Sequence, residues 1–595
     1  MKKILSLTTA LLVLCGLVSG CGTQTNPNQP TEPTQNTQPT RSDETQPPEL
    51  DPDMFTDRDL RTEYTDAARI QLQGSTATSD SPAVQISGST VTITGEGTYL
   101  LSGSLEDGTV VIDIDQKNKL QLVLDGASIH SSTSAALEIR QADKVFLTLA
   151  PGSENSITSE ALTEEGIDGA LFSKQDLTVN GGGKLEITSP AGHGMVCKDD
   201  LVLTGGSYTI NAASHGLDVN DSVRITGETG LTINAGKDGI HCENNDDEAL
   251  GFIYIEQGTV QVEAQGDAIS AGAYANILGG DFKLTAGGGS VNGNKQSSDR
   301  FGGFMGGGGG RPGNRQPRQE TVVTEDSTSM KGLKTVGDLT VSGGTFLVDT
   351  ADDAFHSNRS MIIRGGSFDI KSGDDAFHGE DRLDIIDGQI NIRQSYEGLE
   401  ALKVAVSGGY LMIHADDDGI NAAGGNDESG IAGGRDGMFG GGRPGGHFGG
   451  NSNGSIEISG GKLAIYSTGD CLDANGSIAV SGGELYVTNP RSGDTSALDS
   501  DTGAVITGGR FIGLAASTMM AQSFESSSTQ GVLACTVGNQ KAGTPLTVTD
   551  ARGNTLVTLE TEYDCVLLVI STPDLVKGET YTLTMGETSG ELTAG

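Results

Sequence analysis

A four-residue phrase that returns along the chain limits its fold more than any other feature. Asp-Ala-Phe-His occurs at 353–356 and 375–378, Asp-Gly-Ile-His at 238–241 and Asp-Gly-Ile-Asn at 418–421. Between the phrases lie turn pairs that begin 22, 22 and 21 residues apart, at Gly343, Gly365, Asp387 and Gly408. A fixed period of this size predicts a solenoid, in which each repeat is one coil and equivalent side chains stack into columns.

Each coil offers three short strands. An alternating strand follows the turn pair, as in Gly365–Ile370; a short apolar strand precedes it, as in Met361–Ile363; and the phrase itself is the third. Period-two alternation bounded by glycine is a strand signal. Three strands per 22 residues predict an all-β chain folded as a parallel β-helix. A propeller is the alternative, but its blades need about 40 residues.

The sequence divides into four parts. Coils are expected from 60 to 510, interrupted by Gly-rich loops at 301–318 and 430–454. Residues 511–595 lose the repeat and predict a small C-terminal β unit that caps the coils, because an open end exposes unpaired backbone. No segment after the leader could span a membrane.

The N-terminus has the form of a bacterial lipoprotein leader. Lys2 and Lys3 precede an apolar stretch, and Val18-Ser19-Gly20-Cys21 resembles a lipobox. We expect residues 1–20 to be a signal peptide and Cys21 to carry lipid; the alternative is an ordinary signal peptide with an incidental cysteine. Residues 21–59, rich in Thr, Pro, Gln and Asn, predict a stalk. The mature protein would then be extracellular and tethered to the membrane only by its lipid.

The charge of the chain restricts its partners. Lys and Arg total 37 and Asp and Glu total 79, so the net charge is −42. Such an acidic surface repels nucleic acid and anionic membranes but attracts metal cations. We expect no nucleic-acid partner and a monomer.

The remaining cysteines suggest no zinc site, because no CxxC or Cys/His spacing occurs. Strand alternation places Cys197 and Cys242 in the interior as small hydrophobic residues. Cys535 and Cys565 lie in the C-terminal unit, and the sequence leaves open whether they pair.

Aligned coil by coil, the phrase has four positions. Position one is mostly Asp (with His193 and His215 in earlier coils), position two is Gly or Ala apart from Cys471, and position three is apolar and should face the core. Position four is polar and should point outward. Its members are Asp218, His241, Ser270, His356, His378, Asn421 and Asp473.

Carboxylates stacked at about 4.8 Å repel one another unless a cation or proton lies between them. A cluster of hard oxygen ligands favours calcium. The aspartate in each turn can also simply accept backbone N–H bonds, and the histidines can form a stacked ladder or hold a transition metal. The candidate metal ligands are Asp352, Asp353, Asp374, Asp375, Glu397, Glu400, Asp416, Asp417 and Asp418.

The lipobox, the stalk, the Ser-Gly-Gly coils with Asp-Ala-Phe-His and Asp-Asp-Gly-Ile-Asn, and the loops with Arg-Pro-Gly resemble one family. It is the pectate-lyase-like, carbohydrate-binding β-helix family of bacterial, notably clostridial, surface proteins, and the resemblance covers most of residues 60–590. It implies a right-handed parallel β-helix, bound calcium and binding of plant cell-wall polysaccharide, cellulose or acidic sugar polymers without established catalysis. Carried onto this chain, it places calcium around 352–353, 374–375 and 416–418.

Three functions follow from these observations. The first is a calcium-dependent module that binds an extended, acidic polysaccharide, with His356, His378, Asn421, Tyr396 and Tyr410 as candidate ligand-binding residues. The second is a calcium-dependent polysaccharide lyase, whose base would be one of Arg359, Arg364, Arg382 and Arg393. The third is a structural surface adhesin.

Overall fold

The computed structural model of the protein describes residues 53–293, 329–422, 453–493 and 495–595. These residues belong to one compact unit, Pro47–Gly595. The expected signal peptide 1–20, Cys21, the stalk up to residue 52 and nearly all of the two Gly-rich loops (301–318 and 430–452) lie outside the described residues. In the described part, no helix is both long and apolar enough to cross a bilayer.

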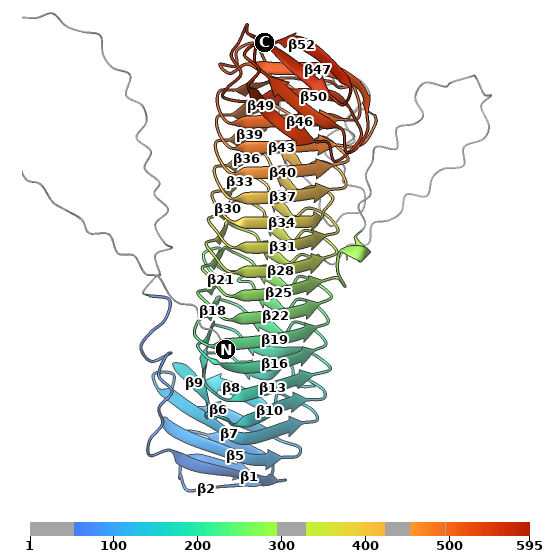
Figure 1. Cartoon of the computed structure of the whole chain (residues 1–595). Coiled ribbons are helices and arrows are strands. Elements are labelled where there is room, and N and C mark those ends of the chain that lie inside the picture. Colours follow the sequence, from blue (N-terminus) through green and yellow to red (C-terminus); the bar gives the residue numbers. More distant parts are fainter. Residues whose placement is uncertain (1–52, 294–328, 423–452, 494) are drawn as a thin grey trace, which may run out of the picture. The chain divides into compact units, whose positions relative to one another are not determined.

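The described residues form a parallel β-helix, as the 22-residue period predicts. Each coil contributes three strands, and strands of successive coils lie one above the next (Figure 1). The first strand of each coil belongs to a sixteen-stranded sheet, which we call sheet B. Its strands are β3 Val84–Ser87, β4 Thr90–Ile93, β6 Thr109–Asp113, β8 Leu137–Gln141, β11 Gly169–Ser173, β14 His193–Cys197, β17 Leu217–Val219, β20 Ile240–Cys242, β23 Ile269–Ala271, β26 Leu333–Thr335, β29 Phe355–Ser357, β32 Phe377–Gly379, β35 Leu399–Ala401, β38 Ile420–Ala422, β41 Leu472–Ala474 and β44 Asp499–Ser500.

The second strand of each coil forms ladder 1. Its members pair in parallel, as in Met361 opposite Leu383. They are β9 Lys144–Leu149, β12 Asp176–Gly181, β15 Asp200–Leu203, β18 Ser222–Ile225, β21 Phe252–Ile255, β24 Ala275–Ile277, β27 Leu339–Val341, β30 Ser360–Ile363, β33 Arg382–Ile385, β36 Lys403–Val406, β39 Ser455–Ile458, β42 Ser477–Val480 and β45 Gly503–Ile506.

The third strand of each coil forms ladder 2, in which Phe346 lies opposite Phe368. Its members are β10 Glu154–Ser159, β13 Lys184–Ser189, β16 Gly206–Ala212, β19 Thr229–Ala235, β22 Thr259–Ala264, β25 Asp281–Ala286, β28 Thr345–Thr350, β31 Ser367–Ser372, β34 Gln389–Gln394, β37 Tyr410–Ala415, β40 Lys462–Ser467, β43 Glu484–Asn489 and β46 Arg510–Ala515. A short 3-10 helix, η1 (Ser290–Asn292), follows β25.

The turn between ladders 1 and 2 explains why Asp387 can replace the first glycine of a pair. The second glycine of each pair adopts the left-handed conformation, with φ of 114° at Gly366 and 138° at Gly388. L side chains rarely adopt this conformation. At Gly366 a Cβ atom would also lie 3.1 Å from the ring of Phe368. The second position therefore requires glycine, whereas the first accommodates Asp387 in this one coil.

The core is a set of stacked apolar columns. The rings of Phe346 and Phe368 stack with centroids 4.8 Å apart, and those of Phe355 and Phe377 with centroids 5.0 Å apart. The position-three residues of the phrase are fully buried in this core, as predicted: Met195, Leu217, Ile240, Ile269, Phe355, Phe377, Ile420 and Leu472. Cys197 and Cys242 also lie in it.

At the N-terminal end, long strands run through both ladders: β1 (Ala68–Gly74), β5 (Gly97–Leu105) and β7 (Lys119–Ser131), with β2 (Ala77–Ser79) antiparallel to β1. The segment before them packs on ladder 1 through Asp59. The Asp59 carboxylate accepts a hydrogen bond from Thr178 and lies 2.8 Å from the Lys144 ammonium.

The C-terminal unit continues ladder 2 instead of standing apart. The last parallel strand, β46, ends at Ala515, a few residues beyond the expected boundary at 510. β50 (Cys565–Ser571) then pairs antiparallel with both β46 and β47 (Val532–Gln540). A separate sheet has the order β49-β48-β51-β52, formed by Thr555–Glu560, Pro545–Thr549, Thr580–Met585 and Thr588–Thr593. Cys535 and Cys565 are free thiols, opposite Leu568 and Gln540.

Candidate functional site

The position-one side chains form a hydrogen-bonded ladder along the turn between ladder 2 and sheet B. Oδ1 of Asp353 accepts the backbone N–H of Asp375 at 3.1 Å, and Oδ1 of Asp375 accepts that of Glu397 at 3.2 Å. Asp267 does the same for Lys331 at 2.7 Å. One oxygen of each of these aspartates therefore satisfies the backbone of the next coil, which is the turn-stabilising role that the sequence left open.

Histidine can replace aspartate at position one because it offers an equivalent acceptor. Nδ1 of His193 accepts the backbone N–H of His215 at 3.3 Å, and Nδ1 of His215 accepts that of Asp238 at 3.2 Å. The rings of His193 and His215 stack with centroids 5.0 Å apart. Accepting these bonds occupies the Nδ1 lone pair, so it favours a structural role for both rings over a metal-binding role through Nδ1.

The second carboxylate oxygen at position one faces position four. Oδ2 of Asp353 lies 2.8 Å from Nδ1 of His356, and Oδ2 of Asp375 lies 3.1 Å from Nδ1 of His378. His378 Nδ1 also lies 2.8 Å from Glu400, the position-four residue of the next coil. The rings of His356 and His378 stack with centroids 4.8 Å apart, so the expected imidazole ladder exists.

The outward direction predicted for position four needs correction in these coils. The side chains of His356, His378, Glu400 and Asn421 lie outside the apolar core, but all four are buried, and His378 is fully so. The carboxylates of Asp353 and Asp375 are buried as well, with 0% and 1% of their surface exposed. This part of the column is an interior polar layer.

Lys331 is a member of the column that the sequence analysis missed. It is buried, and its ammonium lies 2.6 Å from Asp353 and 3.1 Å from Asp352. Leu333 pairs with Phe355, so Lys331-Gly332-Leu333-Lys334 occupies the four phrase positions. Leu333, the apolar residue two positions after Lys331, was the signal by which this copy of the phrase could have been found. The lysine at position one, where aspartate is usual, concealed the copy.

The pKa values of the equivalent aspartate and histidine shift in opposite directions in two neighbouring coils. Burial alone would raise the pKa of Asp353, but the adjacent Lys331 ammonium holds it well below its usual range. Burial and Lys331 lower the pKa of His356 to about 4. One coil further, burial and the carboxylates of Asp374 and Glu400 raise the pKa of Asp375 well above its usual range. Burial opposes protonation of His378, yet Glu400 and Asp375 raise its pKa.

From Glu400 onward the described donors of the column are oxygen atoms. In sheet B, Glu400 lies opposite Asn421, and Asn421 lies opposite Asp473. Oδ1 of Asn421 is buried without a hydrogen-bond partner among the described residues. Burial and the carboxylates of Asp473 and Asp470 raise the pKa of Asp418 well above its usual range. Carboxyl groups and a buried amide oxygen thus meet in three adjacent coils.

The other candidate metal ligands are divided by burial. Asp352, Asp374, Glu397 and Asp417 are buried beside the column, whereas Asp416 is exposed. Asp352, Asp353 and Asp374 each place an oxygen atom within 4.8 Å of the others, close enough to share one ion. The cluster therefore extends from Lys331 to Asp473.

The structure does not gather the four candidate lyase arginines. All four are exposed, on turns or on the outer faces of the ladders. Arg382 pairs with Asp384 at 2.7 Å, and Arg393 pairs with Asp369 on the outer face of ladder 2. Of the candidate tyrosines, Tyr396 is buried next to Glu397, whereas Tyr410 is 49% exposed on β37.

The fold and this column define the protein as a parallel β-helix with an acidic interior layer. A family described as carbohydrate-binding domain-containing proteins matches residues 87–376 and 375–551. The chain therefore belongs to this family.

Two similar proteins show how far the likeness extends. A carbohydrate-binding domain-containing protein of Acetivibrio thermocellus is 33% identical over 207 residues, which are 34% of this chain and 72% of that protein. A solved structure titled as the polysaccharide lyase-like protein from C. thermocellum, gadolinium derivative, shares 33% identity. The match covers 37% of this chain and 92% of that one, with a TM-score of 0.36.

Proposed function

We propose that this protein binds an extended acidic polysaccharide and needs calcium to do so. Membership of a carbohydrate-binding family supports the polysaccharide. The observation that carries the calcium dependence is the oxygen layer around half-buried Asp418 and buried Asn421. A carboxylate whose pKa is raised by neighbouring carboxylates is stabilised when a cation enters the cluster.

The donors from Glu400 to Asp473 fit calcium better than those around His356. Calcium takes six to eight oxygen ligands, including carboxylates and amide carbonyls. Glu400, Asp418 and Asn421, with Asp470 and Asp473, provide such a set. Asp418 and Asp470 each accept a backbone N–H, as Asp353 and Asp375 do. The difference is at position four: the second oxygen of Asp353 and of Asp375 faces an imidazole, whereas the coils of Asp418 and Asp470 carry Asn421 and Asp473 there. We therefore assign calcium to the former stretch first.

Calcium in this position would stabilise the stacking of successive coils. Because Glu400 and Asn421 are buried, an ion between them would offset the carboxylate repulsion and hold successive coils in register. The polymer would then contact the exposed surface of those ordered coils. Calcium dependence arises in this account without a direct bridge between ion and sugar.

The experiment is affinity electrophoresis of the purified full chain in gels that contain polygalacturonate, cellulose derivatives or no polymer, with calcium or EGTA. The proposal expects retardation by polygalacturonate in calcium and its loss in EGTA. The same samples are assayed for unsaturated uronate products. Product release would replace the binding role with a lyase, and no retardation by any polymer would favour a structural adhesin.

We also propose that Cys21 carries lipid and tethers the protein outside the cell. The lipobox Val18-Ser19-Gly20-Cys21 supports this. Metabolic labelling with a radioactive fatty acid should mark the wild-type chain and leave Cys21→Ala unlabelled. Equal labelling of both chains would contradict the proposal.

A further inference from the structure

The outer face of ladder 2 carries a row of side chains that the calcium cluster does not use. Strand alternation sends every second residue outward, and parallel register lines these residues up. One file runs Tyr410, Lys462, Glu484 and Arg510. The neighbouring file runs Met412, Ala464, Tyr486 and Ile512, and its last member, Ile512, is buried by the C-terminal unit.

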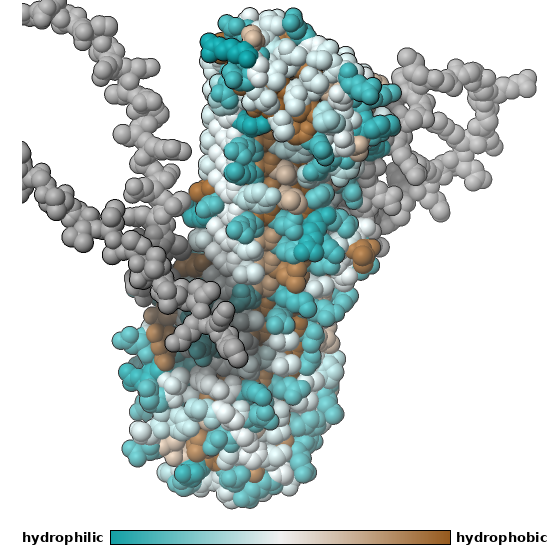
Figure 2. Space-filling view, viewed as in Figure 1, coloured by the Kyte–Doolittle hydropathy of each residue, from teal (hydrophilic) through white to brown (hydrophobic). Residues whose placement is uncertain are grey.

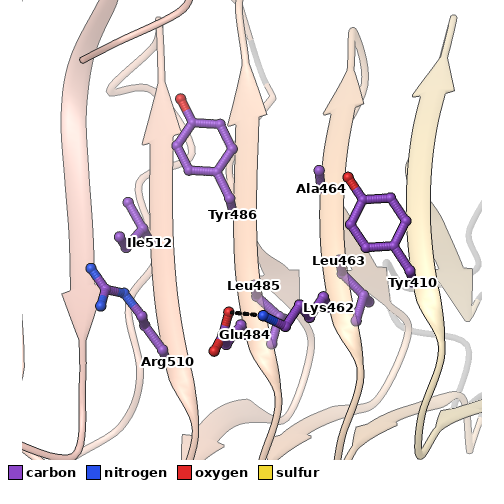
Figure 3. Close-up of a pocket in the computed structure, with 9 residues that line it drawn as sticks. All are labelled: Tyr410, Lys462, Leu463, Ala464, Glu484, Leu485, Tyr486, Arg510 and Ile512. Atoms are coloured by element: carbon purple, nitrogen blue, oxygen red, sulfur yellow. Dashed lines mark ion pairs between the residues drawn. The ribbon is translucent and has the colours of Figure 1, made fainter. Parts of the chain in front are cut away.

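These two files enclose a recess at the C-terminal end of the coils. Figure 3 shows Tyr410 on β37 and Tyr486 on β43 on either side of Ala464 on β40. The alanine methyl is much smaller than either ring, so it leaves a low floor between them. The two rings differ in exposure: Tyr410 is 49% exposed, whereas Tyr486 is half-buried against the C-terminal unit and its hydroxyl is buried. Tyr410 therefore offers apolar surface to the face of a sugar ring, and Tyr486 forms a wall of the recess.

The polar groups of the recess suit a polymer that carries carboxylates. Lys462 pairs with Glu484 at 3.2 Å, and both side chains are well exposed. The Arg510 guanidinium makes no ion pair or side-chain hydrogen bond with the described residues. A guanidinium can bind a carboxylate through two parallel hydrogen bonds, which a lysine cannot do.

The same face continues along the ladder to a second recess. That recess is lined by Lys283, Leu347, Asp349, Asp369, Lys371 and Arg393. Between the two recesses, β34 presents Gln389 and Asn391. Apolar and polar patches alternate along this face (Figure 2). Eight strands from β25 to β46 make a face about 34 Å long at about 4.8 Å per coil. A surface of that length fits a polymer.

The charge balance of this face differs from that of the chain. Its outward residues from β25 to β46 include five cations (Lys283, Lys371, Arg393, Lys462 and Arg510) and four carboxylates (Asp281, Asp349, Asp369 and Glu484). The whole chain has 37 cations and 79 carboxylates. An acidic polymer therefore meets far less repulsion here than the net charge of the protein suggests.

We infer that the outer face of ladder 2, from β25 to β46, is the polysaccharide-binding surface, and that it takes a uronate-containing chain. Tyr410 contacts a sugar ring, and Arg510 and Lys462 bind carboxylates of the polymer. This inference rests on the proposed function and adds the surface and the polymer class.

The test measures affinity of the full chain for polygalacturonate, and for a cello-oligosaccharide of similar length, in saturating calcium. Arg510→Ala should weaken polygalacturonate binding about 10-fold, the scale of one lost charge-assisted hydrogen bond. Tyr410→Ala removes the ring contact and should weaken binding by up to about 10-fold. Arg510→Lys should fall between Arg510→Ala and wild type. Lys119→Ala removes the exposed ion pair with Asp143, comparable to the Lys462–Glu484 pair, on a distant strand, and should leave binding unchanged. Unchanged melting temperatures show that the variants fold.

The outcomes separate the two proposals. If wild type fails to bind polygalacturonate, the proposed function itself fails. If wild type binds and both recess variants bind equally well, the assignment of this face is overturned while the proposed function stands. Equal wild-type affinity for the cello-oligosaccharide would overturn the acidic polymer class.

Discussion

The backbone N–H of Asp375 donates a 3.1 Å hydrogen bond to Oδ1 of Asp353, one coil before it in the solenoid. This bond explains why the phrase starts with a short acceptor side chain. A buried N–H without a partner destabilises the fold, so each turn must provide one acceptor. The second oxygen remains for the polar layer, and the column thus combines a structural and a charge-holding role.

Substitutions at Asp375 should separate these roles. Asp375→Asn keeps an oxygen for the Glu397 N–H and, like a protonated aspartate, removes the charge. We expect it to leave the free energy of unfolding within about 1 kcal/mol of wild type, whereas Asp375→Ala should lose about 1–3 kcal/mol. Urea unfolding followed by circular dichroism measures both. Equal losses in the two variants would contradict the acceptor role.

Lys331 should be more important to stability than its neighbour Lys334. Lys331→Met leaves Asp352 and Asp353 buried without their lysine, and removing one partner of a buried ion pair costs about 3–5 kcal/mol. Lys334 is partly exposed and lies 3.7 Å from Asp267, so Lys334→Met should cost under about 1 kcal/mol. Thermal melts of both variants provide the comparison. A smaller loss for Lys331→Met than for Lys334→Met would refute the assigned role.

Asp59 predicts a pH dependence of stability. Burial opposes ionisation of Asp59, but Lys144, Thr178 and Thr56 lower its pKa to about 2, against 3.8 in the unfolded chain. A lowered native pKa stabilises the fold above the unfolded pKa, and this contribution is lost as pH falls from about 4 to 2. It amounts to about 2 kcal/mol. In Asp59→Asn the loss should already be present at pH 7 and the remaining acid dependence should be smaller. Parallel pH curves for both proteins would be the contrary result.

Asn421 should contribute to calcium binding. Its buried amide oxygen has no hydrogen-bond partner among the residues that the structure describes, and Asn421→Ala removes that oxygen. We expect the calcium-induced rise in melting temperature to shrink in that variant, since ligand binding stabilises by the logarithm of concentration over Kd. Asn234→Ala alters an exposed amide on ladder 2 and is the matched control. An identical calcium response in Asn421→Ala and wild type would exclude Asn421 as a ligand.

Periodicity predicted the fold because a solenoid repeats one local solution. The register of Phe355 with Phe377 follows directly from the spacing of the phrase. The boundary near Arg510 was harder to predict, because β46 keeps its strand pattern while its next partner, β50, comes from about 50 residues later and runs antiparallel. Long-range pairing leaves no local sequence signal.

The candidate site was predicted only in part. Asp353, Asp375, His356 and His378 were found because they share one phrase. Their burial was not, because alternation gives the direction of a side chain but not what covers it. Lys331 was hidden by its residue type, and the recess between Tyr410 and Tyr486 arises from residues 76 positions apart that register places two coils apart.

The most direct test of the account is isothermal titration of the EGTA-treated full chain with polygalacturonate, repeated on the same sample after calcium is restored. We predict no measurable heat of binding without calcium and saturable binding after its return. Binding of equal affinity in both states, or in neither, would contradict a calcium-dependent polysaccharide-binding protein.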